Sequence, residues 1–175
     1  LPPGEVAQVS MGYSHSAVVM KNGDLYMWGS NLYGQIGNGE TESYVKVPKL
    51  VMKNVKMVAC GTYMTAVIKN DGQLFTWGRT YRGSLGNGST EDAKCSMPQK
   101  IMDDIESVSV SINNEEYRCS NVSAVDKEGN LYVWGGGSYY ALGTGNTSDI
   151  ATPRKIMSNI ESASMGNRHG AAVTK

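Results

Sequence analysis

Asn22-Gly23-Asp24-Leu25-Tyr26-Met27-Trp28-Gly29 is the stretch that decides the fold, because its pattern occurs three times. The second copy is Asn70-Asp71-Gly72-Gln73-Leu74-Phe75-Thr76-Trp77-Gly78, and the third is Lys127-Glu128-Gly129-Asn130-Leu131-Tyr132-Val133-Trp134-Gly135. Each copy has a glycine turn, a short run of β-favouring residues, and a tryptophan followed by glycine. Residues that recur in register solve the same packing problem each time, so we interpret the chain as a repeat protein.

The residues around this stretch recur as well. An apolar run precedes each glycine turn, and Asn22-Gly23 between two β-rich runs predicts a tight type I′ hairpin. A glycine-rich loop follows each tryptophan, over residues 34–39, 83–88 and 141–145, and each repeat closes on a proline-led extended segment. Four strands in about fifty residues, without helical periodicity, are typical of one β-propeller blade.

The predicted fold is therefore all-β, built from blades of four antiparallel strands. We expect an incomplete propeller of three repeats plus the start of a fourth. The predicted boundaries are 1–5 for a linker, 6–54, 55–104 and 105–159 for the three repeats, with a loop insertion at 111–120, and 160–175 for the fourth. Because a propeller closes only when its last blade meets its first, we expect an open arc belonging to a larger protein. Its exposed terminal blades favour self-association.

Composition excludes several function classes. Sixteen Lys and Arg residues balance sixteen Asp and Glu residues, which gives no electrostatic footprint for nucleic acid. No apolar run approaches the roughly 20 residues that a membrane-spanning helix needs. The three cysteines do not recur with the repeat and contain no zinc-type spacing. The chain opens at Leu1 without an initiator methionine, so we expect it to be processed or cut from something larger.

The motif set resembles the repeat of the regulator of chromosome condensation family. The hallmarks of that repeat are Gly-x-x-His, a small-apolar strand, an Asp/Asn-Gly turn, Leu-Tyr-x-Trp-Gly and Gly-Gln-Leu-Gly-x-Gly. In the first repeat they correspond to Gly12 with His15, residues 17–20, Gly23, residues 25–29 and residues 34–39. Met64 replaces the second histidine, and the insertion replaces the third Gly-x-x-His. The resemblance implies a propeller, usually of seven blades, and its founding eukaryotic members promote nucleotide exchange on a small GTPase.

The recurring residues are predicted to be structural, and the three tryptophans are expected to be buried at equivalent places between blades. They are Gly12, His15, Gly23, Trp28, Gly29, Gly61, Gly72, Trp77, Gly78, Gly129, Trp134, Gly135, Gly166 and His169. We expect the two histidines to be buried imidazoles that tie a loop to a strand, because equivalent positions face different blades. The acidic residues Asp24, Asp103-Asp104 and Glu115-Glu116 share no element. We therefore predict no catalytic, cofactor-binding or metal-binding residue.

The insertion is the predicted place for a partner contact, because blade packing does not demand it and loops often carry function. Its candidate contact residues are Asn113, Asn114, Glu115, Glu116, Tyr117 and Arg118. The alternative is a tolerated surface insertion, which loop-closure entropy penalises only weakly.

The sequence favours a non-enzymatic module that binds another protein or a surface glycan within a larger propeller. No cofactor, nucleic-acid partner or membrane span is expected. The short loops and Met-rich strands resemble those of the family's copies in secreted or surface proteins of Gram-positive bacteria, which predicts an extracellular or cell-surface location. The alternative is a guanine-nucleotide exchange factor for a small GTPase, located in the cytoplasm or nucleus.

Overall fold

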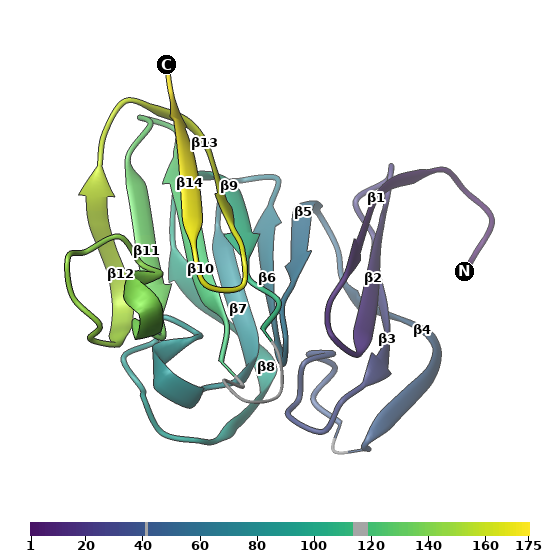
Figure 1. Ribbon diagram of the computed structural model, residues 1–175. Helices are drawn as coiled ribbons and strands as arrows, with labels where there is room; N and C mark the ends of the chain where they lie inside the picture. Colours follow the sequence, from purple (N-terminus) through teal and green to yellow (C-terminus); the bar gives the residue numbers. More distant parts are fainter. Residues whose placement is uncertain (41, 114–118) are drawn as a thin grey trace.

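The sheets of this protein fan out around a line formed by their first strands (Figure 1). The structure is a computed structural model that describes residues 1–40, 42–113 and 119–175. It contains three four-stranded antiparallel sheets and one two-stranded sheet within those residues. The first strands of successive sheets contact one another, β1 with β5, β5 with β9 and β9 with β13. The predicted architecture of propeller blades is thus confirmed.

Within each sheet the strands are adjacent in the order in which they occur in the chain. The first sheet comprises β1 (Val6–Met11), β2 (His15–Met20), β3 (Leu25–Ser30) and β4 (Tyr44–Met52). The second comprises β5 (Val55–Cys60), β6 (Met64–Lys69), β7 (Leu74–Arg79) and β8 (Lys94–Met102). The third comprises β9 (Ile105–Val110), β10 (Asn121–Asp126), β11 (Leu131–Gly135) and β12 (Ile150–Met157). The last comprises β13 (Ile160–Met165) and β14 (Gly170–Thr174). Two short 3₁₀ helices, η1 (Tyr81–Gly83) and η2 (Ser138–Tyr140), lie in the loops after β7 and β11.

The hairpin turn between β2 and β3 differs from the predicted type I′ turn. Gly23 has a φ of 84°, but Asn22 is not among the residues with positive φ. The Gly23 amide donates to the Met20 carbonyl at 2.8 Å, and the Met20 amide donates to the Asp24 carbonyl at 2.9 Å. This is a three-residue loop with one left-handed glycine, the other common way to close a hairpin.

The glycine of this turn also connects neighbouring sheets. The Val55 amide, which begins the second sheet, donates to the Gly23 carbonyl at 2.9 Å. The Ile105 amide donates in the same way to the Gly72 carbonyl, also at 2.9 Å, where the second sheet meets the third. We call such a boundary between neighbouring sheets a seam. The repeat therefore fixes the spacing between blades through its backbone at the turn end of each hairpin.

The core lies between sheets rather than on one side of them. Every residue of β6 except the last is buried, so this strand is covered on both of its faces. Trp77 and Trp134 are fully buried, whereas Trp28 is only half-buried. The prediction of equivalent burial for the three tryptophans is wrong for Trp28, because no sheet of this chain precedes the first one to cover it.

Trp77 joins the first two sheets through one backbone carbonyl. Its indole Nε1–H donates to the carbonyl of Gln35 at 2.9 Å, and the Thr65 hydroxyl donates to the same oxygen at 2.8 Å. His15 Nε2 lies 3.0 Å from the Thr65 hydroxyl oxygen, so it is the donor of that pair. A Cβ at Gly37 would lie 2.5 Å from Trp77 Nε1, which explains the glycine at that position. Four buried groups on two blades thus form one connected network.

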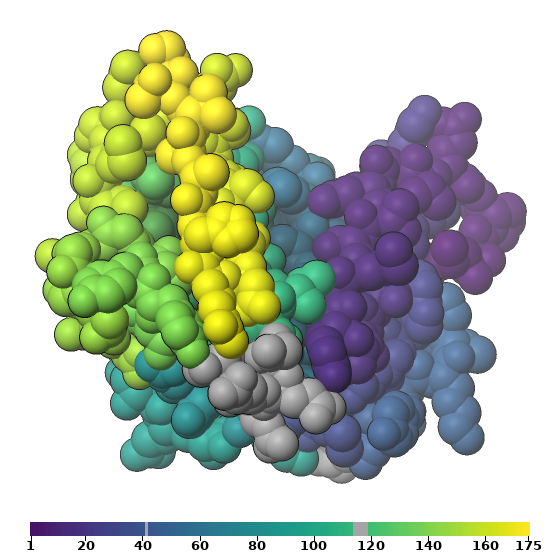
Figure 2. All heavy atoms as spheres, in the orientation of Figure 1, coloured from purple at the N-terminus to yellow at the C-terminus, as the bar shows by residue number. Residues whose placement is uncertain are grey.

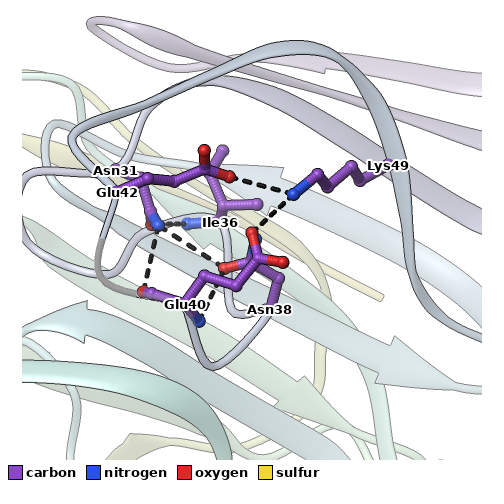
Figure 3. A network of polar contacts seen from close by, with 6 residues as sticks. All are labelled: Asn31, Ile36, Asn38, Glu40, Glu42 and Lys49. Atoms are coloured by element: carbon purple, nitrogen blue, oxygen red, sulfur yellow. Dashed lines mark hydrogen bonds and ion pairs between the residues drawn. The ribbon is translucent and has the colours of Figure 1, made fainter.

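A polar network holds the loop that carries this carbonyl (Figure 3). The Asn31 side-chain oxygen accepts from the Ile36 amide at 3.1 Å, and its side-chain nitrogen donates to Asn38 at 3.4 Å. Lys49 reaches across from β4 and donates to a carboxylate oxygen of Glu40 at 2.5 Å. That hydrogen bond lowers the pKa of the Glu40 carboxyl group. These contacts fix the backbone of the loop around the buried Ile36.

The two histidines differ in burial. His15 is 2% exposed, as predicted, and its ring contacts the neighbouring blade. His169 occupies the equivalent position before β14 but is exposed, because no further sheet of this chain covers it. Figure 2 shows the C-terminal strand β14 uncovered on this face of the molecule. The prediction of a buried imidazole is therefore wrong for His169. Within the described residues, no helix is long and apolar enough to cross a membrane.

Substitution of Trp77 by alanine should lower the free energy of unfolding by ~3–5 kcal/mol, because it removes a fully buried indole and opens a cavity. The Trp28→Ala change is the matched control, and its smaller loss should reflect the half-buried position of that ring. Urea unfolding followed by circular dichroism measures both. Equal losses of unfolding free energy in the two variants would contradict the importance of Trp77 packing between the first two sheets.

Acid should weaken the first seam through His15. Burial lowers the pKa of His15 to about 4, whereas the same side chain in the unfolded chain titrates near its ordinary value of 6.5. The unfolded state then binds more protons, so the free energy of unfolding should fall by about 3 kcal/mol as the pH drops from 6.5 to below 4. Urea unfolding across this range measures the loss. The His15→Gln variant should lack this component, and His169→Gln should retain it.

Candidate functional site

The insertion lies in the loop between β9 and β10, at the end of the blade opposite the hairpin turns. In the first blade, the Gly12 amide donates to the His15 carbonyl at 2.9 Å. In the third blade, the Ser111 amide donates to the Asn121 carbonyl at 2.9 Å. Ser111 and Asn121 therefore occupy the positions of Gly12 and His15, and the sequence has nine residues between them where the first blade has two.

Asn113 is buried at the base of this loop, unlike the exposed contact residue expected from the sequence. It is 4% exposed, and its amide donates to the Thr62 hydroxyl at 2.7 Å. Its side-chain nitrogen donates to the Cys119 carbonyl at 2.5 Å. Asn113 thus fixes the loop to the second blade. The other predicted contact residues, Asn114, Glu115, Glu116, Tyr117 and Arg118, lie outside the described residues.

The same end of the blades carries a cluster of aromatic side chains that the sequence reasoning missed. Tyr13 lies between β1 and β2, Tyr33 between β3 and β4, and Tyr63 between β5 and β6. Tyr81 begins η1, and Arg79 is the last residue of β7. We call these five residues the tyrosine–arginine face. Four different loops of two blades contribute to it.

Arg79 is the centre of the tyrosine–arginine face. Its guanidinium carbon lies 4.6 Å from the ring centroid of Tyr33, 4.8 Å from that of Tyr81 and 5.8 Å from that of Tyr63. Such distances allow attraction between a cation and the faces of the rings. Asp92 accepts from Arg79 Nε at 2.6 Å and from one terminal nitrogen at 2.5 Å. The arginine is therefore held by a carboxylate and three rings together.

The rings also contact one another. The centroids of Tyr33 and Tyr63 are 4.9 Å apart, and those of Tyr13 and Tyr63 are 6.0 Å apart in an edge-to-face arrangement. Tyr13 is 46% exposed, and Leu32, which precedes Tyr33 in the chain, is 41% exposed. The other three tyrosines are half-buried. The rings therefore form a preorganised aromatic surface with one edge exposed to solvent.

The charge of Arg79 in the tyrosine–arginine face is balanced by a carboxylate. The Arg79 side chain is 7% exposed and its Asp92 partner is 49% exposed. The opposite charges of the two side chains leave the pair without a net charge. The hydrogen bonds that Arg79 donates to Asp92 raise the pKa of Arg79 further above its already high value. No cluster of three or more metal-ligating side chains occurs among the described residues.

The acidic residues considered from the sequence lie elsewhere. Asp104 pairs with Lys127 at 2.8 Å, and Asp103 pairs with Lys100 at 2.7 Å. Both lie in the turn between β8 and β9, at the hairpin end of the blades. Asp24 accompanies the Gly23 turn, and its amide donates to the Asn22 side chain. These carboxylates complete turns and do not converge on one site.

The repeat itself has a known counterpart. The chain matches the regulator of chromosome condensation (RCC1) repeat over residues 22–68, 71–112 and 128–173, and again over residues 6–35. The chain belongs to the RCC1 repeat family. The human E3 ubiquitin-protein ligase HERC2 is 34% identical over 158 residues, which cover 87% of this chain and 3% of HERC2. The ultraviolet-B receptor UVR8 of Arabidopsis thaliana is 32% identical over 179 residues, which cover 97% of this chain and 39% of UVR8.

Solved structures show the same fold. Human WBSCR16 superimposes with a TM-score of 0.81 at 23% identity, over 97% of this chain and 44% of that protein. Prp20p of Saccharomyces cerevisiae superimposes with a TM-score of 0.80 at 24% identity, over 98% of this chain and 44% of that protein. The RCC1 repeat chain described here thus spans less than half the length of these relatives. All of them are eukaryotic, and they give no support to the bacterial surface origin predicted from the sequence.

Replacing Arg79 with lysine should cost about 1–2 kcal/mol of stability, because lysine lacks the planar fork that Asp92 and the rings hold. The tyrosine signal in near-ultraviolet circular dichroism should weaken at the same time, since three rings lose their common neighbour. Arg154→Lys on the exposed face of β12 is the matched control. An Arg79→Lys variant as stable as that control would contradict the central position of Arg79.

Proposed function

We propose that this chain is a non-enzymatic protein-interaction module within a longer β-propeller protein, and that the tyrosine–arginine face is its contact surface. The observation that carries the proposal is the arrangement of three tyrosine rings around Arg79, with Tyr13 exposed at the edge. Blade packing requires the tryptophans and glycines of the repeat. It does not require aromatic side chains from four loops to meet.

Two physical arguments support a protein partner. Tyrosine and arginine are enriched among the residues that contribute most to protein–protein affinity. A side chain already held in place loses less conformational entropy when a partner binds, and Arg79 holds its three rings before any partner arrives. The described part of the chain also offers no converging acid and base. A role in recognition is therefore favoured over catalysis.

A surface glycan is the other ligand class that aromatic rings suit, because sugars can stack on them, but none of the relatives named above is described as binding one. A cytoplasmic or nuclear location accompanies the proposal. It is supported by the similarity to yeast Prp20p, a protein described by its binding to Gsp1p and to histones.

Nucleotide exchange on a small GTPase is a second candidate. The supporting observation is the match in fold to Prp20p, which includes all three four-stranded sheets within 98% of this chain. At 24% identity, that match supports a common fold and carries no residue roles. Release of a fluorescent guanine nucleotide from candidate GTPases, with and without the chain, tests this function directly.

The primary test compares proteins captured by three forms of the chain. The double variant Tyr13→Ala/Leu32→Ala truncates the exposed ring of the face and the exposed leucine that precedes Tyr33 in the chain, and Tyr44→Ala truncates a tyrosine that is 58% exposed on the outer strand β4. Quantitative mass spectrometry should show partners that bind the wild type and Tyr44→Ala but bind the double variant about tenfold less. Capture that is equal for all three forms would contradict the proposed face. Loss of binding to a glycan array instead would assign the face to sugars.

A further inference from the structure

The chemistry of the tyrosine–arginine face indicates what kind of protein segment it binds. Three of its rings are joined through Tyr63, whose centroid lies 6.0 Å from that of Tyr13 and 4.9 Å from that of Tyr33. The ring planes of these two pairs are inclined by 71° and 49°, so the rings do not stack flat on one another. The face therefore presents a series of inclined aromatic rings to a partner.

The charge of Arg79 is already used within the face. Its side chain is 7% exposed, and both Nε and one terminal nitrogen donate to the carboxylate of Asp92. The guanidinium also lies 4.6 Å from the ring centroid of Tyr33 and 4.8 Å from that of Tyr81. An acidic ligand would have to displace Asp92, and a cationic ligand on these rings would meet the charge of Arg79 behind them. The rings therefore favour a segment that is uncharged where it touches them.

The backbone of the face is already hydrogen-bonded as well. The Tyr13 amide donates to the Gly61 carbonyl at 3.1 Å, and the Tyr33 amide donates to the side-chain oxygen of Gln35 at 2.9 Å. A strand that adds to a sheet needs unpaired amide and carbonyl groups along an edge, and these loop residues do not supply one. A partner of this face must therefore bind through its side chains and its own carbonyl groups.

An acidic residue at the edge of the face is available to a basic partner. Glu91 precedes Asp92, is exposed, and forms no ion pair with another residue in the described ranges. The Thr80 hydroxyl donates to the Glu91 carbonyl, which holds this residue beside the end of β7. The edge thus carries one negative charge that the face itself does not balance.

We propose that the tyrosine–arginine face binds a proline-rich segment in the polyproline II conformation, with a basic residue at one end of the segment beside Glu91. This inference rests on the proposed function and names the class of its partner. Proline is uncharged, and its fixed φ prepares the segment for binding at a low cost in entropy. Aromatic-lined surfaces recognise this conformation in other protein modules.

The dimensions and hydrogen-bonding groups of such a segment fit the face. A polyproline II helix rises ~3.1 Å per residue, so a segment that passes over the three joined rings in turn does so within about one turn of three residues. Its carbonyl groups make no internal hydrogen bonds and can accept from tyrosine hydroxyl groups. An ion pair with the exposed Glu91 adds little affinity but selects one orientation of the segment.

The test uses the intact chain and a labelled oligoproline peptide that ends in arginine. Fluorescence anisotropy should show saturable binding, whereas a peptide with glycine at every second position lacks the preset conformation and should bind at least about tenfold more weakly. In the chain, Tyr13→Ala should weaken binding about tenfold. Tyr44→Ala, on the outer strand β4, is the matched control and should leave binding unchanged.

A second variant tests the basic end of the segment without touching a ring. Glu91→Gln should weaken binding of the arginine peptide about threefold, because an exposed ion pair is worth at most ~1 kcal/mol. It should leave binding of a peptide that ends in serine unchanged. Because Glu91 is exposed, this variant remains informative even if Tyr13→Ala disturbs folding, which urea unfolding of both variants measures.

Three results would overturn the proposal: equal affinity of the proline and glycine peptides, binding that neither Tyr13→Ala nor Glu91→Gln changes, or no saturable binding up to ~1 mM. The capture experiment separates this failure from failure of the proposed function. Partners that the Tyr13→Ala/Leu32→Ala variant loses, together with no oligoproline binding, would leave the contact face in place and refute only its proline-rich ligand. Equal capture by all three forms, together with no oligoproline binding, would refute both.

Discussion

One backbone carbonyl, that of Gln35, holds the first two blades together. It accepts hydrogen bonds from the Trp77 indole and the Thr65 hydroxyl, and the Thr65 oxygen in turn accepts from His15. All of these groups are buried, so each bond is made where an unmet donor or acceptor would be costly. Gly37 lets the indole approach because any Cβ would collide with it. Apolar burial brings the blades together, and this network selects one register between them.

The same segments that build the seam also position the tyrosine–arginine face. Tyr33 lies two residues before Gln35, whose side-chain oxygen accepts from the Tyr33 amide at 2.9 Å. Arg79 lies two residues after Trp77, and its amide donates to the Tyr63 carbonyl at 2.9 Å. The ring of Tyr33 therefore meets Arg79 because both are short extensions of groups locked in the seam. A surface built in this way is as rigid as the core beneath it, which is what low-entropy recognition needs.

The fold was predictable because its essential residues recur, whereas the candidate site was not, because its residues do not. Recurrence identified the tryptophans, the turn glycines and the blades. The alignment of loops places Ser30 where the second blade has Arg79, so a search for repeats passes over the arginine. The exposure of Trp28 and His169 was not predicted either, because burial depends on whether a neighbouring sheet covers the residue and not on the residue itself. The main-chain acceptor at Gln35 cannot be identified from the sequence, because every residue has a backbone carbonyl.

Comparison of the two complete seams separates what the repeat requires from what it tolerates. The second seam keeps the hydrogen bond from Trp134 to a loop carbonyl. At the positions of His15 and Thr65 it has Met64 and Val122, both buried and both apolar. The polar pair has been exchanged as a unit, which avoids leaving a buried hydroxyl or ring nitrogen without its partner. The departure of Met64 from the Gly-x-x-His motif is thus explained by the residue that faces it. The indole and its carbonyl are the constant part of the seam. The histidine pair is found at the first seam, where we expect the buried imidazole to make stability depend on pH.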